Sequence, residues 1–227
     1  MRRILTIAAH PDDEVLGCGG AMARHAAEGD EVYAAILGEG ATSRADRRDS
    51  ADFSRVEGLK ADARRAAAVL GVKEVFFHGL PDNRFDTLPL IDVIKIVERH
   101  IMDLSPSLVY THHGGDLNVD HRICSQAVLT ATRPKPGTPV REVLAFEVPS
   151  ATDWSFGRSG EPFRPCVFMD ISATLETKLK ALSFYPTEMC PFPHARSLRA
   201  VEAGAVRWGA VSGFAAAEAF ESVRSLR

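Results

Sequence analysis

The 227-residue sequence lacks three features that would indicate a partner or a compartment. Its four cysteines show no CxxC spacing, so we expect buried thiols rather than a cysteine metal or redox site. The formal net charge of −3 argues against a general electrostatic hold on nucleic acid or anionic lipid. No apolar stretch is long enough to span a bilayer, and the apolar start is too short for a secretory signal. We therefore expect a cytoplasmic protein with no membrane span and no nucleic-acid partner.

The sequence does carry regularly alternating strand and helix patterns. Its length, with 45% hydrophobic and 25% charged residues, is typical of one soluble α/β domain. Alternation of this kind predicts βα units on a mostly parallel sheet, and we find no repeat or interdomain linker. The predicted strands are residues 4–9, 32–37, 75–77, a run from 108, 144–148 and 166–171, and the predicted helices are 15–28, 59–70, 89–104, 121–132, 173–182 and 198–211.

Two of the predicted strands end in clusters of histidine and carboxylate. The run Ile4–Ala9 stops at His10-Pro-Asp-Asp-Glu14, and the run from Leu108 stops at a second polar string that closes with Asn118-Val-Asp-His121. Ligands of open parallel sheets bind beyond the carboxyl ends of the strands. Histidine and carboxylate are the ligands of a catalytic zinc ion. The two strand ends therefore predict one divalent metal held between them, with segments 82–84 and 147–150 at the same rim.

The string His10-Pro-Asp-Asp-Glu14 and the pair Asp120-His121 resemble the two motifs of the LmbE/PIG-L family of zinc-dependent N-deacetylases, and the last third of the chain resembles the sugar-processing branch. The resemblance implies one Rossmann-like domain over residues 1–227, with helices on both faces of the sheet. It implies His10, Asp13 and His121 as ligands of one Zn²⁺ and Asp12 as the general base. Ferrous iron also suits two histidines and one carboxylate.

One position departs from the family pattern. Many members carry a histidine where this chain has Asn118, a residue that can donate a hydrogen bond to an oxyanion but cannot act as a general acid near neutral pH. His194, in a proline-flanked loop, is our first candidate to replace that histidine, and His112 is the second. Asp120 is expected either to orient a ligand or base or to cap a helix.

Several of these residues also have purely structural interpretations. Carboxylates at positions 12–14 suit the positive end of a helix dipole, and we assign Glu14 to that role. The segment Gly17-Cys-Gly-Gly20 is an incomplete dinucleotide motif that follows repulsive acids, so we expect close helix–sheet packing there. Trp154 and Phe156 suit either a sugar-stacking face or the core.

Together these features favour hydrolysis of an N-acetyl group on an amino sugar or sugar conjugate, by attack of a metal-activated water with Asp12 as base. A second hypothesis is an amidase acting on a larger sugar–thiol or glycoside conjugate. A third, from another class, is a non-catalytic nucleotide-binding Rossmann module. The expected partner is a small N-acetylated sugar, and the resemblance suggests a homo-oligomer without fixing its size.

Overall fold

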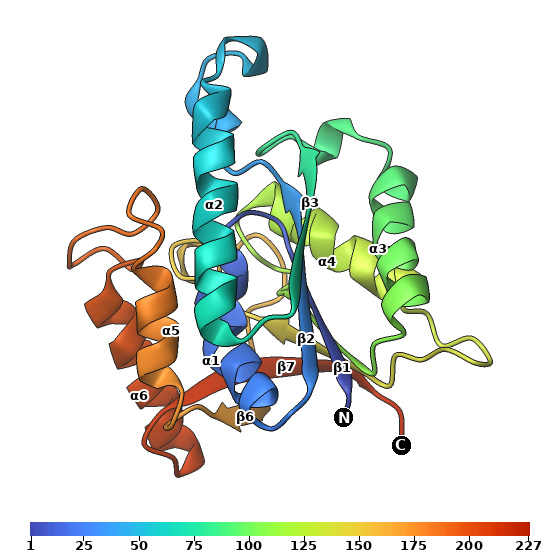
Figure 1. The fold of residues 1–227 in the computed structure, drawn as a ribbon, viewed down its shortest axis with the longest axis vertical. Helices are drawn as coiled ribbons and strands as arrows, with labels where there is room; N and C mark the ends of the chain where they lie inside the picture. The colour runs from blue at the N-terminus through green and yellow to red at the C-terminus, as the bar shows by residue number, and fades with distance from the viewer.

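The computed structural model describes residues 1–227 and is built on one sheet of seven strands (Figure 1). The strand order is β3-β2-β1-β4-β5-β7-β6, and the pairs from β3 to β5 are parallel while β7 is antiparallel to both neighbours. The mostly parallel sheet is therefore confirmed. The strands are β1 (Arg3–Ala8), β2 (Glu31–Gly38), β3 (Glu74–Leu80), β4 (Leu108–His112), β5 (Glu142–Phe146), β6 (Val167–Asp170) and β7 (Ala217–Ser225).

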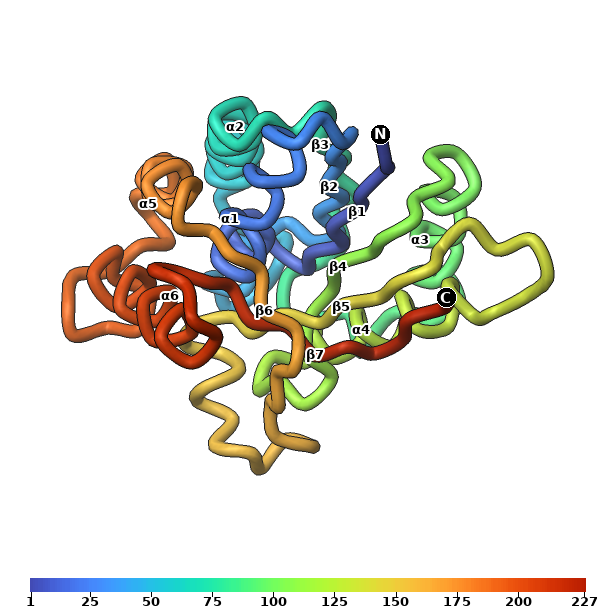
Figure 2. Tube along the Cα trace, turned by 90° about the horizontal axis from the view of Figure 1, so that it is seen from below, coloured from blue at the N-terminus to red at the C-terminus, as the bar shows by residue number.

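Six α-helices cover both faces of the sheet (Figure 2). On one face lie α1 (Asp13–Ala27), α2 (Phe53–Leu70), α5 (Leu175–Leu182) and α6 (Leu198–Ser212), and on the other lie α3 (Leu90–Leu104) and α4 (Val119–Ala131). Each layer has its own apolar core, and the α1 side is the larger, with 26 buried residues against 17. None of the helices combines the length and the apolar character needed to cross a membrane.

The continuous apolar run of β1 follows from this three-layer arrangement. Ile4 packs into the core on the α1 face, whereas Leu5 and Ile7 pack into the core on the α3 face. Because side chains alternate along a strand, a strand covered on both faces needs apolar residues at nearly every position. The strand lies between β2 and β4, so its carboxyl end opens at the middle of the sheet.

The sequence missed some features of the fold. No strand was predicted for β7. Helix α2 was predicted to begin six residues late, since it starts at Phe53. The residue before it, Asp52, caps the helix, and its carboxylate accepts from the backbone N–H of Ser54. Residues 39–52 form a loop that contains two short 3₁₀ turns, Thr42–Arg44 and Arg48–Ser50. The expectation of four buried thiols was wrong for Cys166, which is exposed because the segment before β6 lies at the surface.

Helix α1 is irregular near its middle, and a buried ion pair hydrogen-bonds to the backbone groups that the irregularity leaves free. Cys18 has non-helical dihedral angles (φ −145°, ψ 24°) inside α1. The Glu218 carboxylate accepts from the backbone N–H groups of Gly20 and Ala21, at 2.9 and 2.7 Å. The Lys178 ammonium donates to the Leu16 carbonyl at 2.8 Å and to Glu218 at 2.6 Å. Backbone groups that a regular helix would pair internally are therefore paired by α5 and β7.

The expected close packing of the Gly17 segment is confirmed. A Cβ atom at Gly17 would lie 2.2 Å from the Phe146 ring, and one at Gly20 would lie 2.8 Å from Ile171. These glycines let α1 lie close to Phe146 of β5 and to Ile171, which follows β6.

We predict that Gly17→Ala lowers the free energy of unfolding by about 1–3 kcal/mol, because the added methyl group overpacks the contact with Phe146. Gly58→Ala is the matched control, since Gly58 lies on the exposed side of α2 with no atom within 4 Å of an added Cβ. That change should raise stability by about 0.5–1 kcal/mol through the better helix propensity of alanine. Urea unfolding of both variants measures the two effects, and equal signs would contradict the packing argument.

Candidate functional site

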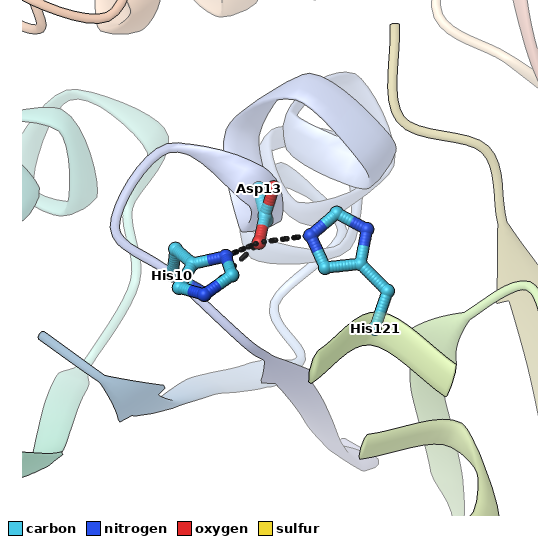
Figure 3. Close-up of side chains that lie close together, drawn as sticks. All are labelled: His10, Asp13 and His121. Carbon is cyan, nitrogen blue, oxygen red and sulfur yellow. Dashed lines mark hydrogen bonds and ion pairs between the residues drawn. The ribbon is translucent and has the colours of Figure 1, made fainter. Parts of the chain in front are cut away.

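The two histidine–carboxylate motifs meet where β1 and β4 end. His10 lies on the turn between β1 and α1, Asp13 is the first residue of α1, and His121 lies in the first turn of α4 (Figure 3). One oxygen of Asp13, Oδ2, is 3.3 Å from His10 Nδ1 and 3.2 Å from His121 Nε2. All three residues are buried, and their candidate ligand atoms lie within 4.8 Å of one another. The structure thus brings together the three residues expected to hold the metal.

A second carboxylate lies behind each imidazole. Asp120 Oδ2 is 2.9 Å from His10 Nε2, and Asp116 Oδ2 is 3.2 Å from His121 Nδ1. The remaining nitrogen of each ring, Nδ1 of His10 and Nε2 of His121, therefore faces Asp13. Carboxylates in this position fix ring orientation and tautomer in metal sites.

The two outer carboxylates are themselves held in place. Asp120 accepts from the backbone N–H groups of Asn83 and Phe85, at 2.7 and 2.9 Å, and Asp116 accepts from the Thr152 hydroxyl at 2.6 Å. Of the two interpretations of Asp120, its contacts support ring orientation. The cap of α4 is Asn118, whose side-chain oxygen accepts from the Asp120 N–H at 2.8 Å. No role was predicted for Asp116 from the sequence, although it stands in the same polar string.

The donor set fits a divalent cation. Asp13 Oδ1 and both ring nitrogens of His121 are buried without a well-aligned hydrogen bond from the protein. Buried polar atoms without partners are costly and rare. A metal ion would satisfy Asp13 and one nitrogen of His121, Nε2, while Nδ1 faces Asp116. His10 also lies near Asp82 and Asp120 in a second group of the right size. Those carboxylates already accept hydrogen bonds, as Asp82 does from the Ser43 N–H and hydroxyl, so the first group is the better metal site.

The charges within this group reinforce one another. Burial alone would raise the pKa of Asp13, but His121 and His10 beside it hold that pKa well below its usual range. Burial would lower the pKa of His121, yet Asp13 and Asp116 raise it to about 9. These shifts favour an ionised Asp13, which can bind a cation, whereas a metal at His121 would have to displace the proton that the raised pKa of this imidazole retains.

Asp12 stands next to the group on a strained backbone. Its φ of 113° lies in the region that non-glycine residues rarely adopt. Burial raises the pKa of Asp12, and Arg196, whose Nη1 donates to Asp12 Oδ2 at 2.7 Å, opposes that shift only in part. The two adjacent carboxylates have different partners, since Asp12 contacts Arg196 and Asp13 contacts His10 and His121.

Glu14 is an acidic residue of the first turn of α1, as expected, and it has contacts that this expectation did not include. It is buried, and burial raises its pKa to about 7. One oxygen accepts from the Tyr185 hydroxyl at 2.6 Å and the other from the backbone N–H of Asp12 at 3.1 Å. Glu14 thus stabilises the strained backbone at Asp12 by accepting the Asp12 N–H.

A polar cavity of about 130 Å³ opens at this rim, and no hydrophobic residue lines it. Asn118 lines it, and its amide nitrogen has no protein partner. Asp82 and Asn83, from the loop after β3, line it as well. The remaining lining residues are His10, Pro11, Asp12, Gly40, Ser43, Arg44, Glu188 and Arg196. A larger, mostly apolar cavity of about 200 Å³ beside α6 contains none of the three candidate ligands.

The two histidines considered as replacements at position 118 lie outside that lining. His112 is fully buried, stacks on His121 at 4.0 Å between ring centroids, and accepts from the Ala9 N–H through Nε2. His194 packs against Trp154 at 5.2 Å, and its Nδ1 accepts from the Arg196 N–H. A catalytic role for His194 stays a prediction. Trp154 and Phe156 are 44% and 81% exposed, so neither belongs to the core.

Comparison with known proteins agrees with this geometry. The family model "PIG-L: GlcNAc-PI de-N-acetylase" matches residues 5–132, which include both motifs. The chain belongs to this family. The uncharacterized deacetylase YaiS of Escherichia coli is 32% identical over 79% of this chain and 88% of its own.

Two further relatives differ in the chemistry that their names describe. The probable N-acetyl-alpha-D-glucosaminyl L-malate deacetylase 2 of Bacillus subtilis is 26% identical over 82% of both chains. The 4-oxalmesaconate hydratase of Pseudomonas putida is 29% identical over 78% of this chain and 70% of its own.

Among solved structures, N,N'-diacetylchitobiose deacetylase from Pyrococcus horikoshii superposes with a TM-score of 0.78 over 98% of this chain and 84% of its own. At 18% identity that likeness establishes the shared fold.

We predict that Asp116→Ala weakens metal binding about 10–100-fold, because His121 loses the carboxylate that orients its ring. His121→Ala should abolish binding. Metal retained after dialysis against a graded chelator measures both effects. Asp49→Ala, which removes a carboxylate from the exposed 39–52 loop, is the control and should bind metal normally. Normal affinity in Asp116→Ala would show that the ring needs no such partner.

Proposed function

We propose that this protein is a metal-dependent hydrolase that removes the N-acetyl group from an N-acetylated amino sugar or sugar conjugate. The observation that carries the proposal is the group of His10, Asp13 and His121, with its unpartnered buried atoms, next to a polar cavity that His10 and Asp12 line. Membership of a de-N-acetylase family supports the reaction class.

His10, Asp13 and His121 would hold one divalent metal, which supplies an acidified water and a polarised carbonyl. Zinc and ferrous iron both suit this set of ligands. Asp12 accepts the proton of the attacking water and passes it to the departing amine. Asn118 donates its free amide N–H to the oxygen that gains charge during attack. Asp120 keeps the His10 ring in place.

The cavity supports a sugar as the substrate. Its lining consists wholly of polar or charged residues with Gly40 and Pro11, which suits a ring covered with hydroxyl groups. Asp82 and Asn83 offer a carboxylate and an amide to those hydroxyls. A lining with no hydrophobic residue favours an acetyl group over a longer acyl chain. The exposed Trp154 and Phe156 leave an amidase acting on a larger conjugate as the alternative.

The nucleotide-binding alternative suits the site poorly, because acidic side chains occupy the start of α1 where phosphates would bind. The hydratase relative shows that one family carries more than one chemistry. Release of free acetate is therefore the measurement that decides the reaction class.

We predict acetate release from N-acetylglucosamine, N,N'-diacetylchitobiose or a glucosaminide conjugate that is lost on chelation and restored by added metal. Asp12→Asn should lower kcat about 10²–10⁴-fold, since an amide cannot take the proton. Asparagine tolerates positive φ, so the turn should survive. Metal content should stay normal. A near-normal rate in Asp12→Asn would assign the base to another group, and no acetate from any substrate would contradict the proposed reaction.

His194→Ala tests the predicted replacement for the family histidine. If His194 turns from Trp154 toward the cavity and supplies a proton, the variant should lower kcat more than it raises KM, with metal retained. Steady-state kinetics with elemental analysis checks this. Unchanged kcat would remove His194 from the reaction.

A further inference from the structure

Arg196 reaches the candidate active site from a remote part of the chain. It precedes Ser197, the cap of α6, and is 184 residues from Asp12 in the sequence. Its side chain is 20% exposed and lines the polar cavity. None of the motifs in the sequence indicated it.

Arg196 is held at three points, two on its guanidinium group and one on its backbone. Its Nη1 donates to Asp12 Oδ2 at 2.7 Å, and its Nε donates to the Ser150 hydroxyl at 2.8 Å. Its backbone N–H donates to His194 Nδ1 at 3.0 Å. Arg44, the other arginine of the lining, is bound instead to Glu188, so Arg196 is the cation paired with Asp12.

This pairing gives the two carboxylate oxygens of Asp12 different surroundings. Oδ2 is held by Arg196, whereas Oδ1 has no protein hydrogen bond and remains available to the cavity. A carboxylate free to rotate would present its oxygen in the wrong direction for part of the time, and misplacement of about 1 Å can cost a factor of about 10² in rate. Because the amide of Asn118 cannot move a proton, the orientation of Asp12 matters for both proton transfers.

We propose that Arg196 is a positioning residue for the deacetylation: it holds Asp12 Oδ2 so that Oδ1 stays directed at the reacting water and amine. This inference rests on the proposed function. Ser150 is part of this positioning, because its hydroxyl accepts from Arg196 Nε and so fixes the plane of the guanidinium group. A planar fork with separate donors for Ser150 and Asp12 is what distinguishes arginine from lysine here.

The experiment compares Arg196→Ala, Arg196→Lys and Ser150→Ala in the metal-loaded enzyme. Arg196→Ala should lower kcat about 10²-fold with little change in KM, metal content or melting temperature. Millimolar guanidinium, well below denaturing concentrations, should restore part of the lost rate. Arg196→Lys and Ser150→Ala should be intermediate. Arg199→Ala is the matched control, since Arg199 is exposed, stacks on Phe192 and does not line the cavity, and it should leave kcat unchanged.

A crystal structure of Arg196→Ala gives a readout that does not depend on activity. The Asp12 carboxylate should occupy more than one orientation, and a single unchanged orientation would overturn the proposal. Normal kcat in Arg196→Ala, a rise in KM alone, or a loss of rate that tracks loss of metal would also overturn it. Wild-type enzyme that releases no acetate would instead count against the proposed function, while the crystallographic result still tests the role of Arg196.

Discussion

The buried charge of Asp13 is the constraint on which the surrounding structure depends. An ionised carboxylate with no exposed surface is very costly unless it is paired and hydrogen-bonded. Asp13 receives the His10 backbone N–H at 2.9 Å and faces two imidazoles. Those rings would in turn be buried without orientation if Asp116 and Asp120 did not hold them. Asp116 and Asp120 thus hold the two rings, and the rings in turn face Asp13. The buried atoms of this group that still lack a partner suit a cation.

The same constraint explains the irregular start of α1. At this turn Asp13 faces the two rings while Asp12 contacts Arg196 and lines the cavity. The positive φ of Asp12 is the local result, and Glu14 stabilises it by accepting the Asp12 N–H. The break at Cys18 then separates this turn from the rest of the helix, with Lys178 and Glu218 pairing the freed backbone groups.

Local patterns predicted most of the sheet and a metal site between two strand ends, and the resemblance to the LmbE/PIG-L family assigned its three ligands, because all of these depend on short segments of sequence. An apolar run that stops at histidine and carboxylate indicates a strand end, and parallel strands bring such ends together. Asp116 and Arg196 could not be recognised in this way. Their roles arise from contacts with residues on other elements, across 36 residues for Asp116 with Thr152 and 184 for Arg196 with Asp12. The strand β7 was missed because its pairing with β5 and β6 comes from tertiary contacts rather than from a clear local signal.

The groups in the cavity that can transfer a proton determine which residue can act as acid and base in the proposed reaction. Asn118 can donate but not transfer a proton, Arg196 stays protonated at any working pH, and His112 is enclosed beneath His121 with its Nε2 already engaged. In the geometry observed, Asp12 is the lining carboxylate that has both a raised pKa and an unpartnered oxygen. Unless His194 turns toward the cavity, one carboxylate must therefore take the proton from water and return it to the amine. An enzyme that relies on a single group for both transfers gains most from holding that group still, so the contact between Arg196 and Asp12 bears directly on the rate of the proposed reaction.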